Sequence, residues 1–559
     1  MIYLVFLISF IFMVPWEYIN KRGWKLTAGY GLLALLLASV LAYFIHPAFR
    51  TGLGWTFFIW PWLLGTGISY MANHNIYGSE DQVTHSLDLH FVSLVLRGAA
   101  SLALVLVVIG YNMFGLVNIS SLSHIPQVRH VDSWPAVNNS DIPVVPESVA
   151  LQTMQNSIGT YGESYEISNI HMERVHGRLY WIGAMDFRPG FFRWKAVHET
   201  APGYMMLDAN NPNATPVVKA GLSMRYTPNA EFGYNLSRLL AEKYPEYLKG
   251  APDLEVSPKG QVYWVVGLYS TEDFASGRKL SEIALVNPVT GNCTVYLPGH
   301  EPSWVNEGIG QYSSSLYADY LGMDSNGFWD KLVTDVGLSK AASAPVGVIG
   351  PQGKLYWFIP MTSTSSSDNS TVGFFMVDAG NGQMLSFKSS GIQNPVAIEQ
   401  RVNGSTSNTS LHADTPMLYN LYGKWAYIVP VVNAANKMED VAIVDPVNST
   451  PPIISPDIQT ALNSWANYLA SGGGYQVGTG AEVRSVSGSV VRVAYSPVGS
   501  NPGWVFIVSS RPKDVFLIPG GTDSWAPLIE PGDKVSFTYR NSFVSPIPVV
   551  SITDENLHM

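Results

Sequence analysis

Short apolar runs bounded by turn signals fill the middle of the chain, and one five-residue phrase introduces several of them. The phrase reads Gly177-Arg-Leu-Tyr-Trp181, then Gly260-Gln-Val-Tyr-Trp264 and Gly353-Lys-Leu-Tyr-Trp357, with a weaker copy at Gly423-Lys-Trp-Ala-Tyr427. A glycine followed by a run rich in aromatic and β-branched residues is typical of a tight turn that enters a β-strand. Self-similarity of this kind predicts an architecture of repeated units.

A second phrase follows each copy and ends in an acidic or amide residue. Its copies are Gly203-Tyr-Met-Met-Leu-Asp208, Glu282-Ile-Ala-Leu-Val-Asn287, Gly373-Phe-Phe-Met-Val-Asp378 and Asp440-Val-Ala-Ile-Val-Asp445. Each reads as a strand that closes at a turn, because Asp and Asn side chains bond the backbone two residues on. The same residues could ligate calcium, but turn formation is the simpler interpretation.

Helical spacing precedes the paired strands. Helices are predicted after Pro146, after the capping residue Asn235 as far as Leu248, from Ser303 to Leu321, and from Asp457 to Ala470. The segments Trp194–His198 and Tyr204–Asp208 are predicted to be a strand pair. The pattern therefore predicts four helix-plus-sheet units, at residues 148–224, 225–300, 301–395 and 396–474. A β-propeller is the alternative, although helices between the units argue against it.

The N-terminal region is more apolar than the rest. Four apolar runs within residues 1–115 are each long enough to cross a hydrocarbon core of about 30 Å as a helix. A signal peptide is the alternative for the first run, but that run lacks a basic start and a small-residue cleavage site. Lys21, Arg22 and Lys25 place the first loop in the cytoplasm, so everything after residue 115 is expected outside. Residues 116–147 are Asn-, Ser- and Pro-rich and are predicted to be a linker.

The pattern changes again in residues 480–559, after a Ser-Gly-Gly-Gly joint. Five strands are predicted there, with a glycine inside the long first strand and Pro531-Gly-Asp533 leading into the fourth. This region resembles an OB-fold barrel. OB-fold barrels often bind single-stranded nucleic acid, but here basic and acidic residues are interleaved without a stripe of one sign. A structural or protein-binding barrel is therefore the favoured interpretation.

Composition narrows the classes of function. The net charge is −10 and there is no basic block, so no electrostatic footprint for nucleic acid is present. The chain has one cysteine, Cys293, which rules out an internal disulfide and cysteine-based metal motifs. Catalytic signatures such as Gly-x-Ser-x-Gly, His-Glu-x-x-His and the phosphate loop are absent from the sequence. No catalytic residue, cofactor or metal is predicted.

The candidate binding residues are the phrase tryptophans Trp181, Trp264 and Trp357, together with Arg97. The tryptophans would line a ligand groove, although strand aromatics in a repeat are more often core residues. Arg97 falls inside the fourth apolar run, where it is a functional candidate or else reaches the nearby membrane surface.

Two groups of polar residues were weighed as metal ligands. His85, Asp88 and His90 match no ligand spacing, and a solvated loop is favoured for them. His171, Glu173 and His176 lie on one predicted hairpin, with the first two on one face, and are interpreted as surface residues.

Two resemblances bear on the repeated region. Val286-Asn287-Pro-Val-Thr-Gly291 and Val377-Asp378-Ala-Gly-Asn-Gly382 resemble the strand-and-turn ending of PepSY modules, in which a helix packs on a meander of strands. Residues 225–470 are also similar to a family of large, uncharacterised membrane-anchored bacterial proteins, on the strength of Pro302-Ser-Trp-Val305 and Gly373–Asp378. The resemblance implies architecture and no activity.

These observations predict an α+β fold with N-terminal transmembrane helices, tandem extracytoplasmic units and a C-terminal OB-like barrel. The predicted function is a non-enzymatic binding or assembly protein of the cell envelope, polytopic in the cell membrane. Its partners would be the lipid bilayer and other envelope proteins or further copies of itself. The alternative is an accessory subunit of a membrane enzyme or transport complex that works through Arg97 or the His85–His90 loop.

Overall fold

The computed structural model describes most of residues 119–556 and six isolated helical residues nearer the N-terminus. The six are Leu32, Leu36, Val40, Ala99, Leu102 and Leu106. Within 119–556 the positions outside the description are 162, 273–276, 325–337, 365–370, 389–390, 407, 471–474, 477–482, 497–502, 520–524 and 541–545.

The predicted membrane anchor is wrong for the part of the chain that the structure describes. None of the described helices is long and apolar enough to cross a bilayer. The predicted fold class and cell-membrane location both required such helices, and they are corrected accordingly. The four apolar runs of residues 1–115 lie outside the described residues apart from the six named above, and so do Arg97 and the loop with His85, Asp88 and His90. The prediction rested on the length and hydropathy of the runs alone.

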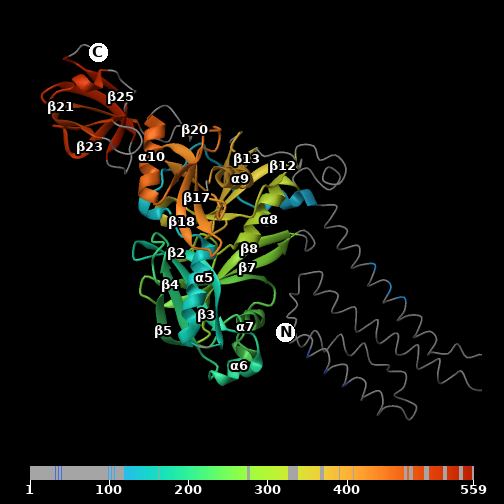
Figure 1. Ribbon diagram of the computed structural model, residues 1–559. Helices are drawn as coiled ribbons and strands as arrows, with labels where there is room; N and C mark the ends of the chain where they lie inside the picture. The colour runs from blue at the N-terminus through green and yellow to red at the C-terminus, as the bar shows by residue number, and fades with distance from the viewer. Residues whose placement is uncertain are drawn as a thin grey trace, which may run out of the picture.

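Sheets dominate the described residues, which is the second correction to the predicted α+β fold class. Five separate sheets are present, and the last of them is a closed barrel (Figure 1). The reason is that, among the described residues, each helix is accompanied by several strands. In Figure 1 the first four sheets form one body, and the barrel lies beyond α10 at the end of that body away from α6.

The first two sheets are simple meanders in which each strand pairs with the next along the chain. The first sheet follows α5 (Glu147–Ser157) and consists of β2 (Tyr165–Val175), β3 (Arg178–Phe187), β4 (Ala201–Asp208) and β5 (Val217–Met224). The second follows α7 (Leu236–Lys243) and consists of β6 (Leu248–Val256), β7 (Val262–Glu272), β8 (Gly277–Val286) and β9 (Cys293–Tyr296). In each, one edge strand, β2 or β6, therefore has one unpaired side.

The third and fourth sheets keep the meander and add strands to it. The third follows α8 (Gln311–Gly322) and consists of β10 (Ser339–Ala341), β11 (Val346–Ile349), β12 (Leu355–Ser363), β13 (Gly373–Asp378) and β14 (Met384–Phe387), with β1 (Val128–His130) parallel to β14. The fourth follows α9 (Pro395–Ser405) and consists of β15 (Leu411–Ala413), β16 (Met417–Leu421), β17 (Lys424–Asn433), β18 (Met438–Val444), β19 (Ile453–Ser455) and β20 (Tyr475–Gln476).

The C-terminal strands close into a barrel after α10 (Ile458–Ala470). They are β21 (Val483–Ser496), β22 (Gly503–Val508), β23 (Arg511–Pro519), β24 (Lys534–Arg540) and β25 (Ile547–Asp554), paired in the order β21-β22-β23-β25-β24. The long strand β21 serves two neighbours, since residues up to Ser489 pair with β24 and residues from Val490 pair with β22. Gly488 lies at this change of partner. The barrel has its own core, separate from the rest.

The five-residue phrase has the same structure in all four sheets. Its glycine lies at the hairpin turn with positive φ, at +83° for Gly177, +76° for Gly260, +74° for Gly353 and +86° for Gly423. Residues with a Cβ rarely adopt such backbone angles, so glycine is the residue that this turn requires. The predicted turn is confirmed for every copy.

The aromatic residue at the fifth position of the phrase ties the sheet to the segment that leads into the helix. Trp181 Nε1 donates to the carbonyl of Val145 at 2.8 Å, and Trp264 Nε1 donates to that of Tyr226 at 2.9 Å. In the third sheet Trp357 Nε1 donates to Ile309 O at 2.8 Å, and in the fourth Tyr427 Oη donates to Gln393 O at 3.0 Å. We call Val145, Tyr226, Ile309 and Gln393 the entry residues.

Each entry residue makes a second contact that is also repeated. Its backbone N–H donates to the carbonyl of the residue after the strand-end Asp or Asn, namely Ala209, Pro288, Ala379 and Pro446 in the four sheets. These distances run from 2.8 to 3.0 Å. The four sheets are therefore equivalent at the level of individual hydrogen bonds, even though the fourth has tyrosine in place of tryptophan.

The strand-end residues form the turns that the sequence predicts. Asp208 Oδ1 accepts the N–H of Asn210 at 2.9 Å, and Asp378 Oδ1 accepts that of Gly380 at 2.9 Å. Asn287 and Asp445 each accept two backbone N–H groups in the same way. These carbonyl and carboxylate oxygens are used by their own turns, which agrees with the simpler interpretation given above.

Several local predictions are wrong. The helix predicted as far as Leu248 ends at Lys243, and Leu248 begins β6. The helix predicted from Ser303 begins only at Gln311.

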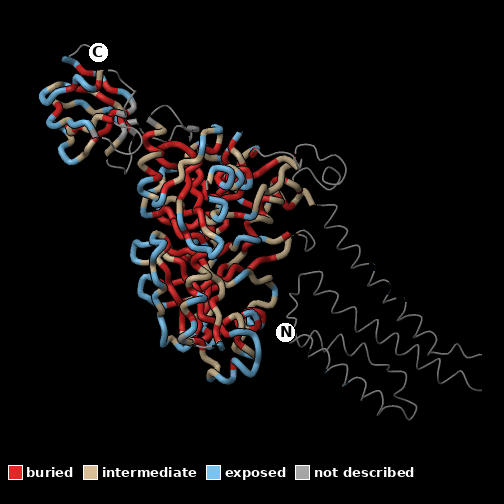
Figure 2. Tube along the Cα trace, in the orientation of Figure 1, coloured by how far each residue is buried: buried red, intermediate tan, exposed pale blue. Residues whose placement is uncertain are grey.

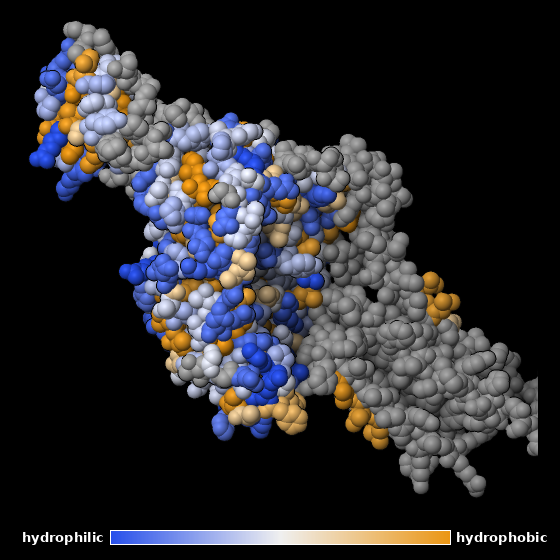
Figure 3. All heavy atoms as spheres, in the orientation of Figure 1, coloured by the Kyte–Doolittle hydropathy of each residue, from blue (hydrophilic) through white to orange (hydrophobic). Residues whose placement is uncertain are grey.

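Residues 194–198, predicted as a strand, belong to α6 (Phe191–Ala196) and the turn after it, where Trp194 is buried beside Tyr234 and Phe232. Hydrophobic side chains gather at this tip of the body (Figure 3), among them Phe192, which is 85% exposed. An apolar stretch of this length is compatible with a helix or a strand, and its tertiary packing favours the helix.

The segment 116–147, predicted as a linker, is part of the body from residue 119 onward. Trp134 is buried against the rings of Tyr356 and Phe387, and β1 extends the third sheet. The composition of this segment is typical of a flexible linker, but composition does not reveal that a few of its apolar side chains are buried in a core. One core cluster has residues of all four sheets, and a second cluster is formed mainly by residues of the second and third sheets and α8. Figure 2 shows buried residues throughout the body.

Candidate functional site

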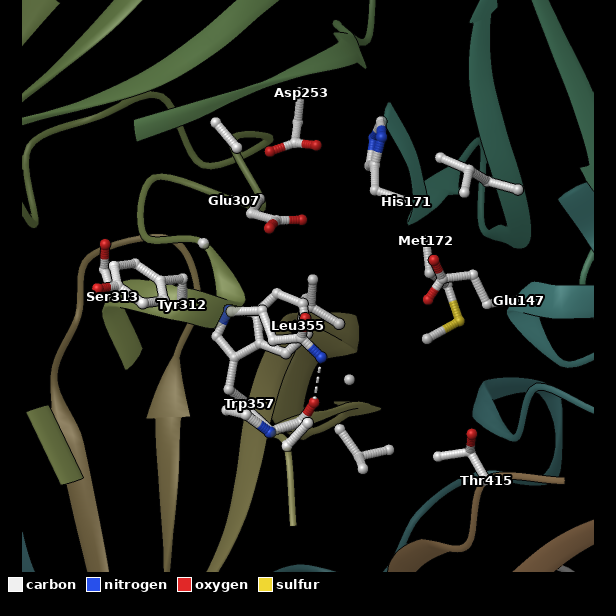
Figure 4. A pocket seen from close by; sticks show the side chains of 18 of the residues that line it. Glu147, His171, Met172, Asp253, Glu307, Tyr312, Ser313, Leu355, Trp357 and Thr415 are labelled. Atoms are coloured by element: carbon white, nitrogen blue, oxygen red, sulfur yellow. Dashed lines mark hydrogen bonds between the residues drawn. The ribbon is translucent and has the colours of Figure 1, made fainter. Parts of the chain in front are cut away.

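A cavity of about 900 Å³ lies between the first four sheets. Its wall takes residues from the start of α5 and from β2, from β6 and β7, from the loop before α8 and from β12, and from α9 and the segment before β16. Every repeated part of the body thus contributes to one space. Figure 4 shows this space with residues of the first and second sheets on opposite sides of it.

Aromatic and apolar side chains form one side of the cavity. Trp357, Tyr312 and Leu355 lie together there (Figure 4). Tyr312, at the start of α8, is 64% exposed. Because the indole N–H of Trp357 is already bonded to Ile309, this ring offers the cavity its face and not its donor.

Acidic residues also line the cavity, among them two that are buried. Asp253 and Glu307 lie in the same half of the view as Tyr312, and the exposed Glu147 lies across the space beside Met172 (Figure 4). Asp253 lies on β6 and is 6% exposed, and Glu307 lies in the loop before α8 and is 7% exposed. Glu147, the first residue of α5, points toward the same space (Figure 4). Buried carboxylates are costly unless they are paired or hydrogen-bonded, so Asp253 and Glu307 need a physical explanation.

Two neighbouring acids, Glu173 and Glu255, have clear structural partners. Glu173 on β2 accepts the N–H of Val256 at 3.0 and 3.2 Å, across the gap between edge strands β2 and β6. Glu255 accepts the N–H groups of Asn306 and Glu307 at 2.8 and 2.7 Å. These side chains satisfy backbone donors that no strand pairs with, and they join the two edge strands and the loop.

Asp253 and His171 differ from them, because part of their hydrogen-bonding capacity is unused. Asp253 Oδ2 is buried without a hydrogen-bond partner, and so are both ring nitrogens of His171, a residue that is 4% exposed. Both residues line the cavity, and in Figure 4 the His171 ring lies near Asp253. Glu173 Oε2 is 3.6 Å from His171 Nε2.

The electrostatics of this side follow from burial and from like charges. Burial, with the nearby charge of Glu173, raises the pKa of Glu255 to about 8. Burial also raises the pKa values of Asp253 and Glu307. The charges of Glu255 and Glu147 add to both shifts, and the charge of Asp253 adds to the shift of Glu307. His171 is the one basic group, among the described residues, whose charge opposes the rise in the pKa of Asp253.

Two basic residues, Lys249 and Arg278, lie in the wall, but they interact with groups other than Asp253 and Glu307. Arg278 lies over the ring of Tyr312 at 5.5 Å. Burial lowers the pKa of Lys249 to about 8, and the carboxylate that opposes this shift is Glu246, which does not line the cavity. The acidic side of the cavity is therefore not neutralised by the lysine and arginine of its own wall.

This arrangement has two chemical uses in principle. Carboxyls with raised pKa values can act as general acids, but a proton relay needs an oriented base, and neither His171 nitrogen is fixed by a hydrogen bond. Alternatively, unneutralised acids beside aromatic rings can hold a ligand. The second use needs no further preorganisation, so the geometry favours binding.

Only some of the residues predicted from the sequence as site residues line the cavity. Trp181 and Trp357 line the cavity, whereas Trp264 is completely buried in the core and is not part of the wall of this cavity. His171 and Glu173, interpreted as surface residues, are both buried, which corrects that interpretation. His176 is exposed at its hairpin turn, as expected.

The sequence analysis missed Asp253, Glu255 and Glu307. A usable signal existed, since Asp253-Leu-Glu255-Val256 places two acids at alternate positions of a strand, as His171 and Glu173 are placed on β2. What the pattern does not show is that both faces of β6 are buried.

Comparison with known proteins does not assign the chain to a family. No protein-family model matches the chain, and no curated protein matches it.

Proposed function

We propose that the described part of the chain is a non-enzymatic binding protein whose ligand occupies the central cavity. One observation carries this proposal: a single space of about 900 Å³ is lined by residues from all four repeated sheets. A volume of this size suits a small organic molecule. The repeated frame supports the same function, because each sheet is held to its helix by the entry-residue contacts and presents a rigid wall to the cavity.

The resemblance to PepSY modules is compatible with this proposal and stays a prediction. It concerns the helix-and-meander construction of each unit, which the proposal uses only as a frame. Assembly with protein partners or with further copies of the chain also stays a prediction.

The proposal can be tested with the neutral fluorescent probe N-phenyl-1-naphthylamine. We expect saturable binding with a stoichiometry of one to the purified full chain, because the apolar side of the cavity can take an aromatic body. Thr415→Trp should weaken binding by narrowing the cavity, since Thr415 lies in its wall (Figure 4). The matched control is Val217→Trp, which adds the same side chain to exposed β5 outside the cavity. Equal binding by the two variants, or none by the unmodified chain, would contradict the proposal.

A further inference from the structure

The acidic side of the cavity has charges that the described protein does not neutralise. Asp253 and Glu307 are both more than nine-tenths buried, and neither makes an ion pair with a lysine or arginine within the described residues. The charges that act on Glu307 belong to Asp253, Glu255 and Glu147, all of which are carboxylates. A site of this kind is stabilised either by protons or by a cation that enters from outside.

The unused atoms define what such a cation should carry. Asp253 Oδ2 is an acceptor without a donor, and a neutral His171 ring has one nitrogen that accepts. Both side chains are buried and aimed into the cavity (Figure 4). A primary ammonium group has three donors and no acceptor, so it satisfies Asp253, His171 and the adjacent Glu307 together.

The rest of the cavity defines the body of the ligand. Trp357, Tyr312 and Leu355 form an apolar side next to the acids (Figure 4). Aromatic rings attract cations through their faces and also pack against aromatic or aliphatic groups. In the part of the chain that the structure describes, no group of three or more His, Cys, Asp and Glu residues is arranged to hold a metal ion. An organic cation therefore fits this wall better than a bare metal ion.

We propose that the central cavity binds a primary amine, with its ammonium group between Asp253, Glu307 and His171 and its apolar body against Trp357 and Tyr312. This inference rests on the proposed binding function and names the ligand class for the same site. Lys249 and Arg278 also face the cavity, but they do not neutralise this acidic side, as shown above.

Binding of a primary amine at this site should be coupled to the release of protons. Because burial raises the pKa values of Asp253 and Glu307, part of the free protein carries protons there near neutral pH. An ammonium group favours the ionised carboxylates, so protons should be released when it binds, and affinity should rise with pH until the amine itself begins to lose its proton. The other titratable or charged groups in this wall are Glu147, His171, Glu399, Lys249, Arg278, Tyr269 and Tyr312.

The test is calorimetric titration of the full chain with 2-phenylethylamine and, separately, with 2-phenylethanol. The two probes share an aromatic body and differ in the ammonium group. We expect the amine to bind at least about tenfold more tightly, since hydrogen bonds to charged groups contribute about 1.5–3 kcal/mol. Asp253→Asn should remove that preference and leave the affinity for the alcohol unchanged, while Asp132→Asn, on an exposed residue outside the cavity, should change neither.

Glu307→Gln provides a second variant in case Asp253→Asn does not fold. It should weaken the binding of 2-phenylethylamine in the same way. Equal affinity for the two probes, or no binding of either, would overturn the inference. Binding of the alcohol or of N-phenyl-1-naphthylamine without preference for the amine would leave the proposed binding function standing. If the amine, the alcohol and N-phenyl-1-naphthylamine all fail to bind, both this inference and the proposed binding function are contradicted.

Discussion

Asp445 and Asp253 are two buried aspartates whose surroundings have opposite effects. Asp445 ends a strand of the fourth sheet, and Asp253 lies in the wall of the cavity; they are 3% and 6% exposed. Burial alone would raise the pKa of Asp445, but donors from Asn448, Tyr468 and Val447 outweigh it and lower that pKa. Asp253 has an unpartnered oxygen, and burial raises its pKa.

The difference separates the frame of this molecule from its cavity. We use "frame" for the phrase aromatics, the entry residues and the strand-end turns, where every named polar atom is bonded to a neighbour in the same unit. In the cavity wall, polar atoms from different sheets meet and part of their capacity is unused. Changes in the frame should therefore cost stability, whereas changes in the wall should cost binding.

The largest effect is expected from truncating a frame tryptophan. Trp264→Ala removes a completely buried side chain and its bond to Tyr226, which should lower the free energy of unfolding by about 3–5 kcal/mol. Trp357→Ala should cost clearly less, because Trp357 is only partly buried, but it should weaken binding of 2-phenylethylamine. Urea unfolding measures the first effect and calorimetry the second. Trp357 belongs both to the frame and to the cavity wall, so unchanged binding of 2-phenylethylamine by Trp357→Ala would contradict its place in the wall.

The second effect is a dependence of stability on pH. Glu255 has its pKa raised from 4.5 to about 8, so between these values the folded protein binds more protons than the unfolded chain. The free energy of unfolding should therefore fall as the pH rises through this window, by about 4–5 kcal/mol at roughly 1.4 kcal/mol per pKa unit. Urea unfolding between about pH 5 and pH 8 checks this. Glu255→Gln should flatten the fall, and an unchanged slope in that variant would assign it to other groups.

A third test compares the two aspartates directly. Asp445→Asn removes the charge that the turn donors stabilise and should lower the free energy of unfolding by about 1–2 kcal/mol at neutral pH. Asp253→Asn removes an uncompensated buried charge, so stability should stay the same or rise. Thermal unfolding of both variants in one buffer measures the contrast. A clear loss of stability in Asp253→Asn would place this residue in the frame.

The smallest effect concerns the fourth sheet. Tyr427→Phe removes one hydroxyl and leaves the carbonyl of Gln393 without this donor, which should cost about 1 kcal/mol. The ring and its packing remain, so the probe affinities should not change. A cost near zero would show that the fourth copy does not depend on the bond that the tryptophans make in the other three.

The sequence predicts the frame better than the cavity, for a physical reason. Gly177 and Asp208 act within a few residues of themselves, through φ and through turn hydrogen bonds, so local patterns reveal them. The N-cap of α7 is equally local, and Arg238 N donates to Asn235 Oδ1 at 3.0 Å as expected. Such features depend little on the rest of the fold.

Other features depend on contacts between sheets, which no local pattern records. His171 and Glu173 read as a polar strand face, yet that face packs against β6 and is buried. Residues 194–198 belong to α6 and the turn after it, where Trp194 packs beside Tyr234 and Phe232. Glu307 reaches the cavity from a loop, through a neighbourhood that exists only once the second and third sheets are assembled.

The most direct test of the account is a crystal structure of the chain with 2-phenylethylamine bound. The account predicts the ammonium nitrogen within hydrogen-bonding distance, about 3 Å, of Asp253 Oδ2, with the phenyl ring against Trp357. An amine bound outside the cavity, or a cavity closed by its own side chains, would contradict it.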